Sequence, residues 1–199
     1  MTELHYVEAA RNRGNGVKTF RFTATIVLAL VLFGALSASA SAQTVNRTNV
    51  PAGEAVPTGG TFSIRFPTAF TDLEARAKAD TPGGSDAVVR MLTGLNGDGV
   101  RFSATETPFP TGQQLRPIED FMEAAKQRPR AVVTDVHREH QGDTEILSFT
   151  LDDFKGGTYF HIARTKAAQY MQVIQFPESQ RDKATAMKDD FFGSFKIIQ

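Results

Sequence analysis

The chain of 199 residues contains no cysteine and no tryptophan, and its charges cancel, with 22 Lys and Arg against 22 Asp and Glu. Without cysteine the chain can form neither a disulfide nor a thiolate nucleophile, and it offers no cysteine for lipid attachment. The charge balance argues against a nucleic-acid-binding protein, whose footprint is a clear basic excess. It argues equally against a polybasic protein that binds membrane surfaces. Phenylalanine, at 16 residues, predicts a core rich in phenyl rings.

The common catalytic and cofactor-binding motifs are also absent. The sequence has no Gly-x-Ser-x-Gly, no phosphate-binding loop, no dinucleotide fingerprint and no His-Glu-x-x-His. We therefore assign no catalytic residue, no metal ligand and no cofactor, and we expect a protein that is not an enzyme.

An uncharged stretch near the N-terminus predicts export. It covers residues 22–36, follows the basic Lys18 and Arg21, and precedes alternating serines and alanines. This order is typical of a secretory signal peptide, whereas spanning a bilayer takes roughly 20 apolar residues. We predict a signal peptide over residues 1–42 and a periplasmic or secreted protein that meets the membrane only during export.

Two details of this leader stay open at the level of sequence. Small residues place the cleavage between Ala42 and Gln43, with a cut after Ala40 as the alternative. A start at Val17 would give a more typical leader, so residues 1–16 are either an extended leader or are not translated.

The rest of the chain has the length of one domain. Residues 43–60 contain two prolines and three glycines and predict a flexible tether. Residues 61–199 predict the folded domain. The chain after residue 42 carries 18 basic and 20 acidic side chains, so the balance of charge persists without the leader.

Turn residues divide this domain into strands and helices. Asn96-Gly97-Asp98-Gly99 and Gly142-Asp143 are strong hairpin signals between alternating apolar runs. Strands are expected at 61–66, 88–95, 100–107, 132–140, 145–151, 158–165, 170–176 and 194–198. Pro117 opens one helix, and Ala184, Met187 and Phe191 line a second that ends at Gly193. The result is an α+β domain, a mostly antiparallel sheet of about seven strands packed with two main helices.

Three short segments within this order resemble the PsbP-like family, which includes DcrB-like periplasmic domains. They are Phe62-Ser63-Ile64-Arg65-Phe66-Pro67, Val173-Ile174-Gln175-Phe176-Pro177, and Phe191-Phe192-Gly193-Ser194-Phe195-Lys196. The resemblance covers residues 61–199. It implies a PsbP-like fold and a non-enzymatic accessory or binding role, and it carries over no functional residue.

The residues themselves predict one polar constellation. The Gly142-Asp143 turn pairs His137 with Ser148 and Asp135 with Thr150. Val136, Val132 and Thr134 are then expected on the face of Phe149. If Phe160 and Ile162 share the face of Phe149, His161 shares the face of Ser148. One side of three adjacent strands would then carry the candidate ligand-binding residues Asp135, His137, Glu139, Ser148 and His161.

Competing interpretations of this constellation remain open. His137 and His161 would lie roughly 9–10 Å apart at the backbone, so both could bind one zinc ion only by leaning together. A serine nucleophile normally occupies a strained turn and not the middle of a strand. The leading hypothesis is an exported accessory or protein-interaction domain whose partner is another exported protein. The alternatives are a small-ligand or divalent-metal-binding protein that uses the His137/His161 face and, third, a hydrolase.

Overall fold

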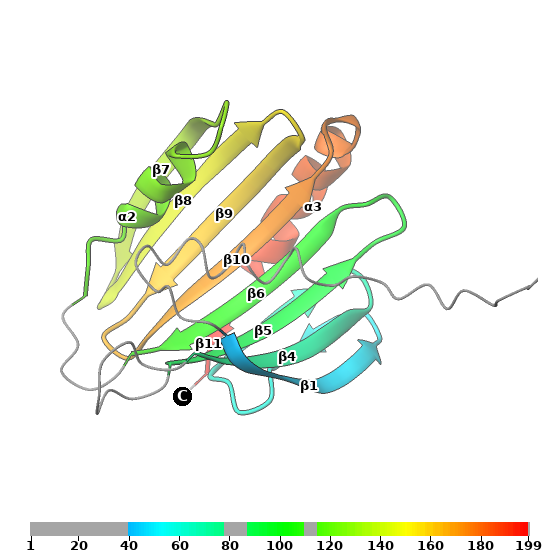
Figure 1. Cartoon of the computed structure of the whole chain (residues 1–199), viewed down its shortest axis with the longest axis vertical. Helices are drawn as coiled ribbons and strands as arrows, with labels where there is room; N and C mark the ends of the chain where they lie inside the picture. Colours follow the sequence, from blue (N-terminus) through cyan, green and yellow to red (C-terminus); the bar gives the residue numbers. More distant parts are fainter. Residues whose placement is uncertain (1–39, 78–86, 110–114, 199) are drawn as a thin grey trace, which may run out of the picture.

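The computed structural model describes residues 40–77, 87–109 and 115–198 (Figure 1). Eight antiparallel strands form one sheet in the order β1-β4-β5-β6-β10-β9-β8-β7. These strands are β1 (Ala40–Val50), β4 (Phe70–Ala77), β5 (Ala87–Leu95), β6 (Arg101–Pro108), β7 (Val132–Gln141), β8 (Thr144–Asp153), β9 (Gly156–Arg164) and β10 (Ala168–Phe176). A second sheet, ordered β11-β3-β2, contains β2 (Gly53–Ala55), β3 (Phe62–Phe66) and β11 (Lys196–Ile197).

One helix packs on each face of the large sheet. In the view of Figure 1, α2 (Asp120–Lys126) lies on the near face, and α3 (Arg181–Gly193) lies on the far face after the short 3-10 helix η2 (Glu178–Gln180). Helix α2 buries Phe121, Met122 and Ala125 against alternate residues of β8 and β9 such as Phe149 and Phe160. The sheet is therefore covered on both sides, and successive residues of its central strands enter two different cores.

The core on the α3 side is built mainly from phenyl rings, as the composition predicts. Phe191 of α3 packs edge-on against Phe66 and Phe102, with ring centroids 5.6 and 5.3 Å apart. Phe66, from the small sheet, and Phe102, from β6, are 1% and 0% exposed. Aromatic packing thus joins the two sheets and α3 into one unit.

The expected α+β class with a mostly antiparallel sheet and two helices is confirmed. The Asn96 turn forms as predicted, because the Asn96 side-chain oxygen accepts backbone hydrogen bonds from Asp98 and Val100 at 3.0 and 2.9 Å. The prediction of about seven strands was too low, since β1, β2 and β4 had no counterpart in it.

The prediction of a flexible tether over residues 43–60 is corrected by the structure, which places β1 and β2 there. The cause is Asp72, a fully buried carboxylate on β4. It accepts hydrogen bonds from Arg47 Nε at 2.9 Å and from the backbone N and Oγ1 of Thr58 at 3.1 and 2.7 Å. These bonds fix the segment that proline and glycine suggested would be free, and the predicted cleavage position, Ala42–Gln43, lies on β1.

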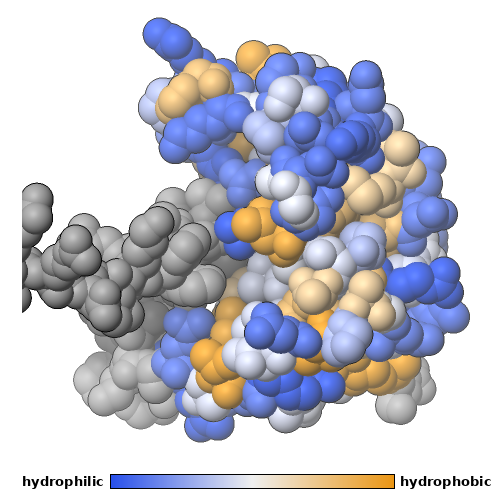
Figure 2. All heavy atoms as spheres, turned by 90° about the vertical axis from the view of Figure 1, so that its right-hand side faces the viewer, coloured by the Kyte–Doolittle hydropathy of each residue, from blue (hydrophilic) through white to orange (hydrophobic). Residues whose placement is uncertain are grey.

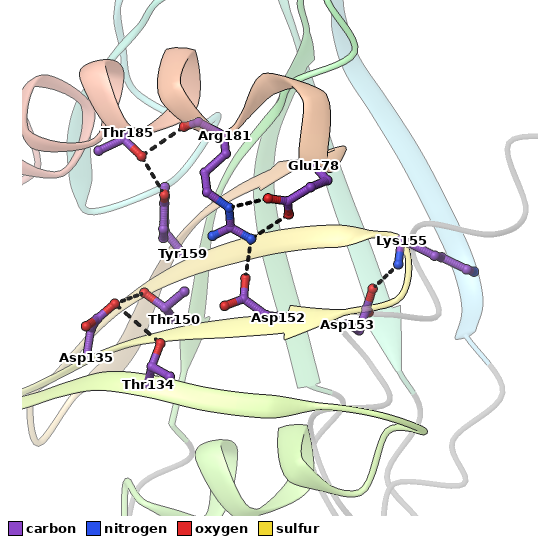
Figure 3. Close-up of polar contacts among 10 residues, drawn as sticks. All are labelled: Thr134, Asp135, Thr150, Asp152, Asp153, Lys155, Tyr159, Glu178, Arg181 and Thr185. Carbon is purple, nitrogen blue, oxygen red and sulfur yellow. Dashed lines mark hydrogen bonds and ion pairs between the residues drawn. The ribbon is translucent and has the colours of Figure 1, made fainter.

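Arg181, at the start of α3, forms salt bridges that attach this helix to the sheet (Figure 3). Arg181 Nη2 lies 2.8 Å from Asp152 on β8 and 2.6 Å from Glu178 in η2, and its guanidinium lies 5.3 Å from the centre of the Phe176 ring. Tyr159 of β9 adds a 2.7 Å hydroxyl contact with Thr185. The helix is therefore anchored to the strands that carry the candidate site.

The surface at the end of the sheet with the β5–β6 and β8–β9 hairpins mixes apolar and hydrophilic residues (Figure 2). Phe154 and Leu95, which are 65% and 53% exposed, lie in or beside these two hairpins. Isolated exposed apolar side chains of this kind are ordinary on a folded protein.

Candidate functional site

The polar row predicted across three strands forms with the expected register. His137 on β7 lies opposite Ser148 on β8, and Ser148 lies opposite His161 on β9. All three belong to the α3 side of the sheet, since Phe149 and Phe160 point to the α2 side. Phe160 and Ile162 thus share the face of Phe149, as the prediction required, and Ser148 and His161 share the opposite face.

Asp135 reaches this face by a different route from the one predicted. Thr134, and not Asp135, lies opposite Thr150, because a β-bulge inserts one extra residue between Thr134 and His137. Asp135 adopts a left-handed backbone with φ 52° at this bulge. The expectation that Val132 and Thr134 share the face of Phe149 is wrong, because they lie opposite Asp152 and Thr150. The Asp135 carboxylate nevertheless accepts a 3.0 Å hydrogen bond from the Thr150 hydroxyl (Figure 3).

His161, like Ser148, is half-buried. Its Nδ1 lies 2.9 Å from the Ser148 hydroxyl, and its ring stacks on Phe192 of α3 at a centroid distance of 5.5 Å and an interplanar angle of 22°. Burial lowers the pKa of His161, and the charge of Glu139 only partly opposes that effect. A neutral imidazole at pH 7 follows, held between a hydroxyl and a phenyl ring.

His137 and Glu139 lie apart from that enclosed pair. Their side chains are 68% and 39% exposed, and His137 Nε2 is 3.5 Å from Glu139 Oε2. They occupy the outer strand of the row, so the five candidate residues form an enclosed part and an exposed rim, and not one compact cluster.

This arrangement does not assemble the catalytic or metal geometries considered from the sequence. In a Ser–His–Asp triad the carboxylate orients the histidine, whereas here Asp135 bonds to Thr150 and His161 bonds to Ser148 through Nδ1. Within residues 40–77, 87–109 and 115–198, no three His, Asp or Glu side chains come close enough together to hold a metal ion.

Ser148 and His161 instead line an open groove, which we call the α3 groove, with a volume of ≈ 680 Å³. Its floor consists of residues of β8 and β9, among them Thr150. Its wall is formed by α3 and the segment after it, with Phe192, Lys188 and Ile197. Both sides of the groove are mixed: the floor has Ile146 beside Ser148 and His161, and the wall has Lys188, Asp189 and Lys196 beside Phe192 and Ile197.

The wall of the α3 groove could not be found from the sequence. Lys188, Phe192 and Lys196 are 27 or more residues from His161 along the chain, and no short motif joins them. The only sequence signal was that Phe191 and Gly193 mark the end of a helix, which says nothing about the strands beside it.

Similarity to known proteins does not identify the function of this site. No family model, no curated protein and no solved structure matches the chain. None of the helices in the described part of the chain combines the length and apolar character needed to cross a membrane.

Proposed function

We propose that this chain is an exported, non-enzymatic accessory domain that binds a short segment of another exported protein in the α3 groove. The observation that carries the proposal is the groove itself, an open trough whose lining mixes hydrogen-bonding, charged and apolar side chains. Such a mixture suits a polypeptide, which presents polar backbone groups together with apolar side chains.

The dimensions of the groove favour an extended segment. Its β8 floor runs from Thr144 to Thr150, six residue steps, which correspond to about 20 Å along a strand. The exposed Ile197, at 37%, supplies apolar surface along the wall. A segment of several residues can lie along this floor with its apolar side chains against α3.

The neighbouring sheet edge is a less suitable place for the same segment. Eight of the ten β7 residues are exposed, but the strand carries Arg138 and Glu139 and is bent by the Asp135 bulge. Charged residues and bulges are the devices by which proteins protect a strand edge from pairing. We therefore place the partner in the groove and not as a ninth strand.

Export and family membership are part of the same proposal. The basic, apolar and small-residue order of residues 18–42 supports a cleaved signal peptide and a periplasmic or secreted protein. The mostly antiparallel α+β architecture is compatible with the PsbP-like resemblance, which stays a prediction.

Site-specific photo-crosslinking in the exporting cell tests the groove. A photoreactive residue at Thr144, on the floor, is expected to give one adduct of defined mass, whereas the same residue at Lys166, 86% exposed and outside the groove, gives none. The crosslinked partner peptide, made synthetically, should then bind the purified protein, and Ile197→Glu should weaken binding at least tenfold. Adducts of equal yield at both positions, or a peptide indifferent to Ile197→Glu, would refute the proposal.

A small ligand in the same groove is the second candidate. Its volume of ≈ 680 Å³ lies within the range of roughly 300–1,000 Å³ typical of ligand pockets. The Ser148–His161 pair is already aligned by a hydrogen bond. A rise in melting temperature with a metabolite, lost in His161→Gln, would favour this candidate, and a rise with a divalent metal that is lost in His137→Ala would favour metal binding.

A further inference from the structure

The turn between β5 and β6 holds an asparagine side chain with two backbone donors. Asn96 precedes Gly97, and this is the one Asn-Gly pair in residues 43–199. The side-chain oxygen Oδ1 of Asn96 accepts hydrogen bonds from the backbone N–H groups of Asp98 and Val100 at 3.0 and 2.9 Å. A carbonyl oxygen with two N–H donors is polarised, and the carbon bonded to it, Cγ, becomes more open to nucleophilic attack.

The nearest nucleophile to this carbon is the backbone nitrogen of Gly97. Among the described residues, no hydrogen bond occupies its N–H group. Gly97 is exposed, so water and hydroxide reach it. Because glycine has no Cβ, its nitrogen can approach another group closely. The carbonyl carbon, Cα and Cβ of Asn96 join this nitrogen to Cγ, so rotations about the Cα–C and Cα–Cβ bonds can close a five-membered ring.

We propose that Asn96 is a site of spontaneous deamidation and isomerisation in the folded protein, with water as the co-reactant. Hydroxide removes the proton of the Gly97 nitrogen, which forms a bond to Asn96 Cγ. The Cγ–Nδ2 bond then breaks, and Nδ2 leaves as ammonia after it takes a proton from water, which regenerates hydroxide. The N–H groups of Asp98 and Val100 stabilise the negative charge that Oδ1 carries in the intermediate.

Water opens the resulting cyclic imide at either of its two carbonyl carbons. Addition at Cγ gives an aspartate with the normal main chain. Addition at the main-chain carbonyl carbon gives an isoaspartate, in which the chain runs through the former side chain and is longer by one carbon atom. In both cases the net reaction consumes one water and releases one ammonia, and the product has a carboxylate in place of the neutral amide.

Two other asparagines in the described part of the chain provide internal comparisons. Asn46 and Asn49 are followed by an arginine and a valine, whose Cβ atoms crowd the attacking nitrogen. The Nδ2 group of Asn46 also donates a 3.4 Å hydrogen bond to the buried Asp72. Both sites should therefore react more slowly than Asn96 in the same molecule.

The modification should leave the protein folded. The turn contacts α3 through Asp98, whose carboxylate lies 3.0 Å from Lys183 Nζ. These two side chains are 46% and 59% exposed, so this ion pair contributes little to stability and its loss is tolerated. Modified molecules are expected to accumulate as folded protein. The inference does not depend on the α3 groove.

Peptide mapping by mass spectrometry tests the proposal on the purified exported protein, incubated at mildly alkaline pH below its melting temperature. Trypsin places Asn96 in the peptide 91–101 and separates Asn46 from Asn49 by cleavage after Arg47. The peptide 91–101 should gain about 1 Da at least ten times faster than the other two peptides. Isomerisation at Asp98, which also precedes a glycine, changes no mass, so the gain reports Asn96 alone.

Gly97→Ala tests the attacking nitrogen without disturbing the turn. Gly97 has no positive φ, and no atom lies within 4 Å of an added Cβ, so the melting temperature should stay unchanged while the rate at Asn96 falls at least tenfold. Gly193→Ala meets the same two structural conditions far along the chain and is the matched control, with the rate at Asn96 unchanged.

Two results would overturn the proposal. If Asn96 in the folded protein reacts no faster than Asn46 and Asn49, while the urea-unfolded chain loses ammonia at Asn96, the turn protects this side chain instead of exposing it to attack. If Gly97→Ala and the unmodified protein react at Asn96 at equal rates, the ammonia is not released by the Gly97 nitrogen.

Discussion

Buried carboxylates determine how the first part of the domain is held. Asp72 and Glu106 lie on neighbouring parts of the α3 side and are 0% and 1% exposed. Glu106 accepts a 2.8 Å hydrogen bond from the Thr61 backbone and a 3.3 Å bond from Arg90. Each carboxylate thus satisfies donors of a loop that has no regular secondary structure of its own, and it stabilises that loop more effectively than an apolar contact could.

Replacement of Asp72 by Asn should therefore destabilise the protein by roughly 2–3 kcal/mol, because it removes a buried charge from its donors and leaves Arg47 without its carboxylate partner. Urea unfolding measures the change. Asp143→Asn, at an 83% exposed carboxylate paired with Lys166, should alter stability by less than about 0.5 kcal/mol. Equal effects of the two substitutions would contradict this role of Asp72.

The acid response of Asp72 has a definite sign. Burial raises its pKa, but hydrogen bonds from Thr58 and Arg47 outweigh that effect and leave the pKa below its usual value. The group therefore stabilises the fold above the pKa of the unfolded chain and loses this contribution as the pH falls through the lowered folded-state value. In Asp72→Asn the fall of stability with acid should be shallower.

His161 is expected to change the stability of the fold between pH 7 and pH 5, at higher pH than Asp72. Because burial lowers its pKa, the unfolded chain takes up a proton first as the pH falls below about 6.5. Stability should then decrease from pH 7 towards pH 5 and be unaffected by this group above pH 7. Denaturant titrations at several pH values should show the decrease flattened in His161→Gln and retained in His137→Gln, whose side chain is 68% exposed.

Among the strands and helices, the sequence predicted well those elements whose turns are encoded locally. The β5–β6 and β7–β8 hairpins follow from Asn96-Gly97 and Gly142-Asp143, since these residues adopt the turn by themselves. Strand β4 was missed because Asp72 points inward and breaks the apolar-in pattern, and β1 was missed because it pairs with β4, whose residues lie 20 or more positions further along the chain.

The candidate site shows the same limit on a smaller scale. The pairing of His137, Ser148 and His161 was predictable from turn length and alternation. The bulge at Asp135 was not, because no glycine marks the left-handed position. The α3 wall was not predictable either, since nothing local specifies which strands a helix covers.

A substitution at Gly156 tests how closely the β8–β9 hairpin packs on the end of β10. Gly156 has φ 141°, and a Cβ there would lie 2.1 Å from the Phe176 backbone oxygen. Gly156→Ala should therefore cost several kcal/mol, well above the roughly 1 kcal/mol typical of a strained turn alone. Gly142→Ala, with φ 59° and no atom within 4 Å of the added carbon, is the matched control and should cost about 1 kcal/mol.

At the scale of the whole molecule, the described residues form two cores that share one sheet. Phe149 stacks on Phe160 at 4.6 Å on the α2 side, while Phe191 packs on the α3 side. Each central strand supplies residues to both cores in alternation, so neither core can be lost while the strands remain paired and packed. This sharing predicts one cooperative unfolding transition.

Tyrosine fluorescence makes that prediction testable, because the chain has no tryptophan and both tyrosines of the described part, Tyr159 and Tyr170, belong to the α3-side core. Phe149→Ala, on the α2 side, should destabilise the protein by roughly 3–5 kcal/mol. It should shift the tyrosine transition and the far-ultraviolet circular dichroism transition together, although neither tyrosine lies on its side of the sheet. Val132→Ala, at a 56% exposed position, should shift neither. A dichroism change that precedes the tyrosine change in Phe149→Ala would mean that β7, β8 and α2 unfold as a separate unit, and the sheet would then not couple its two faces.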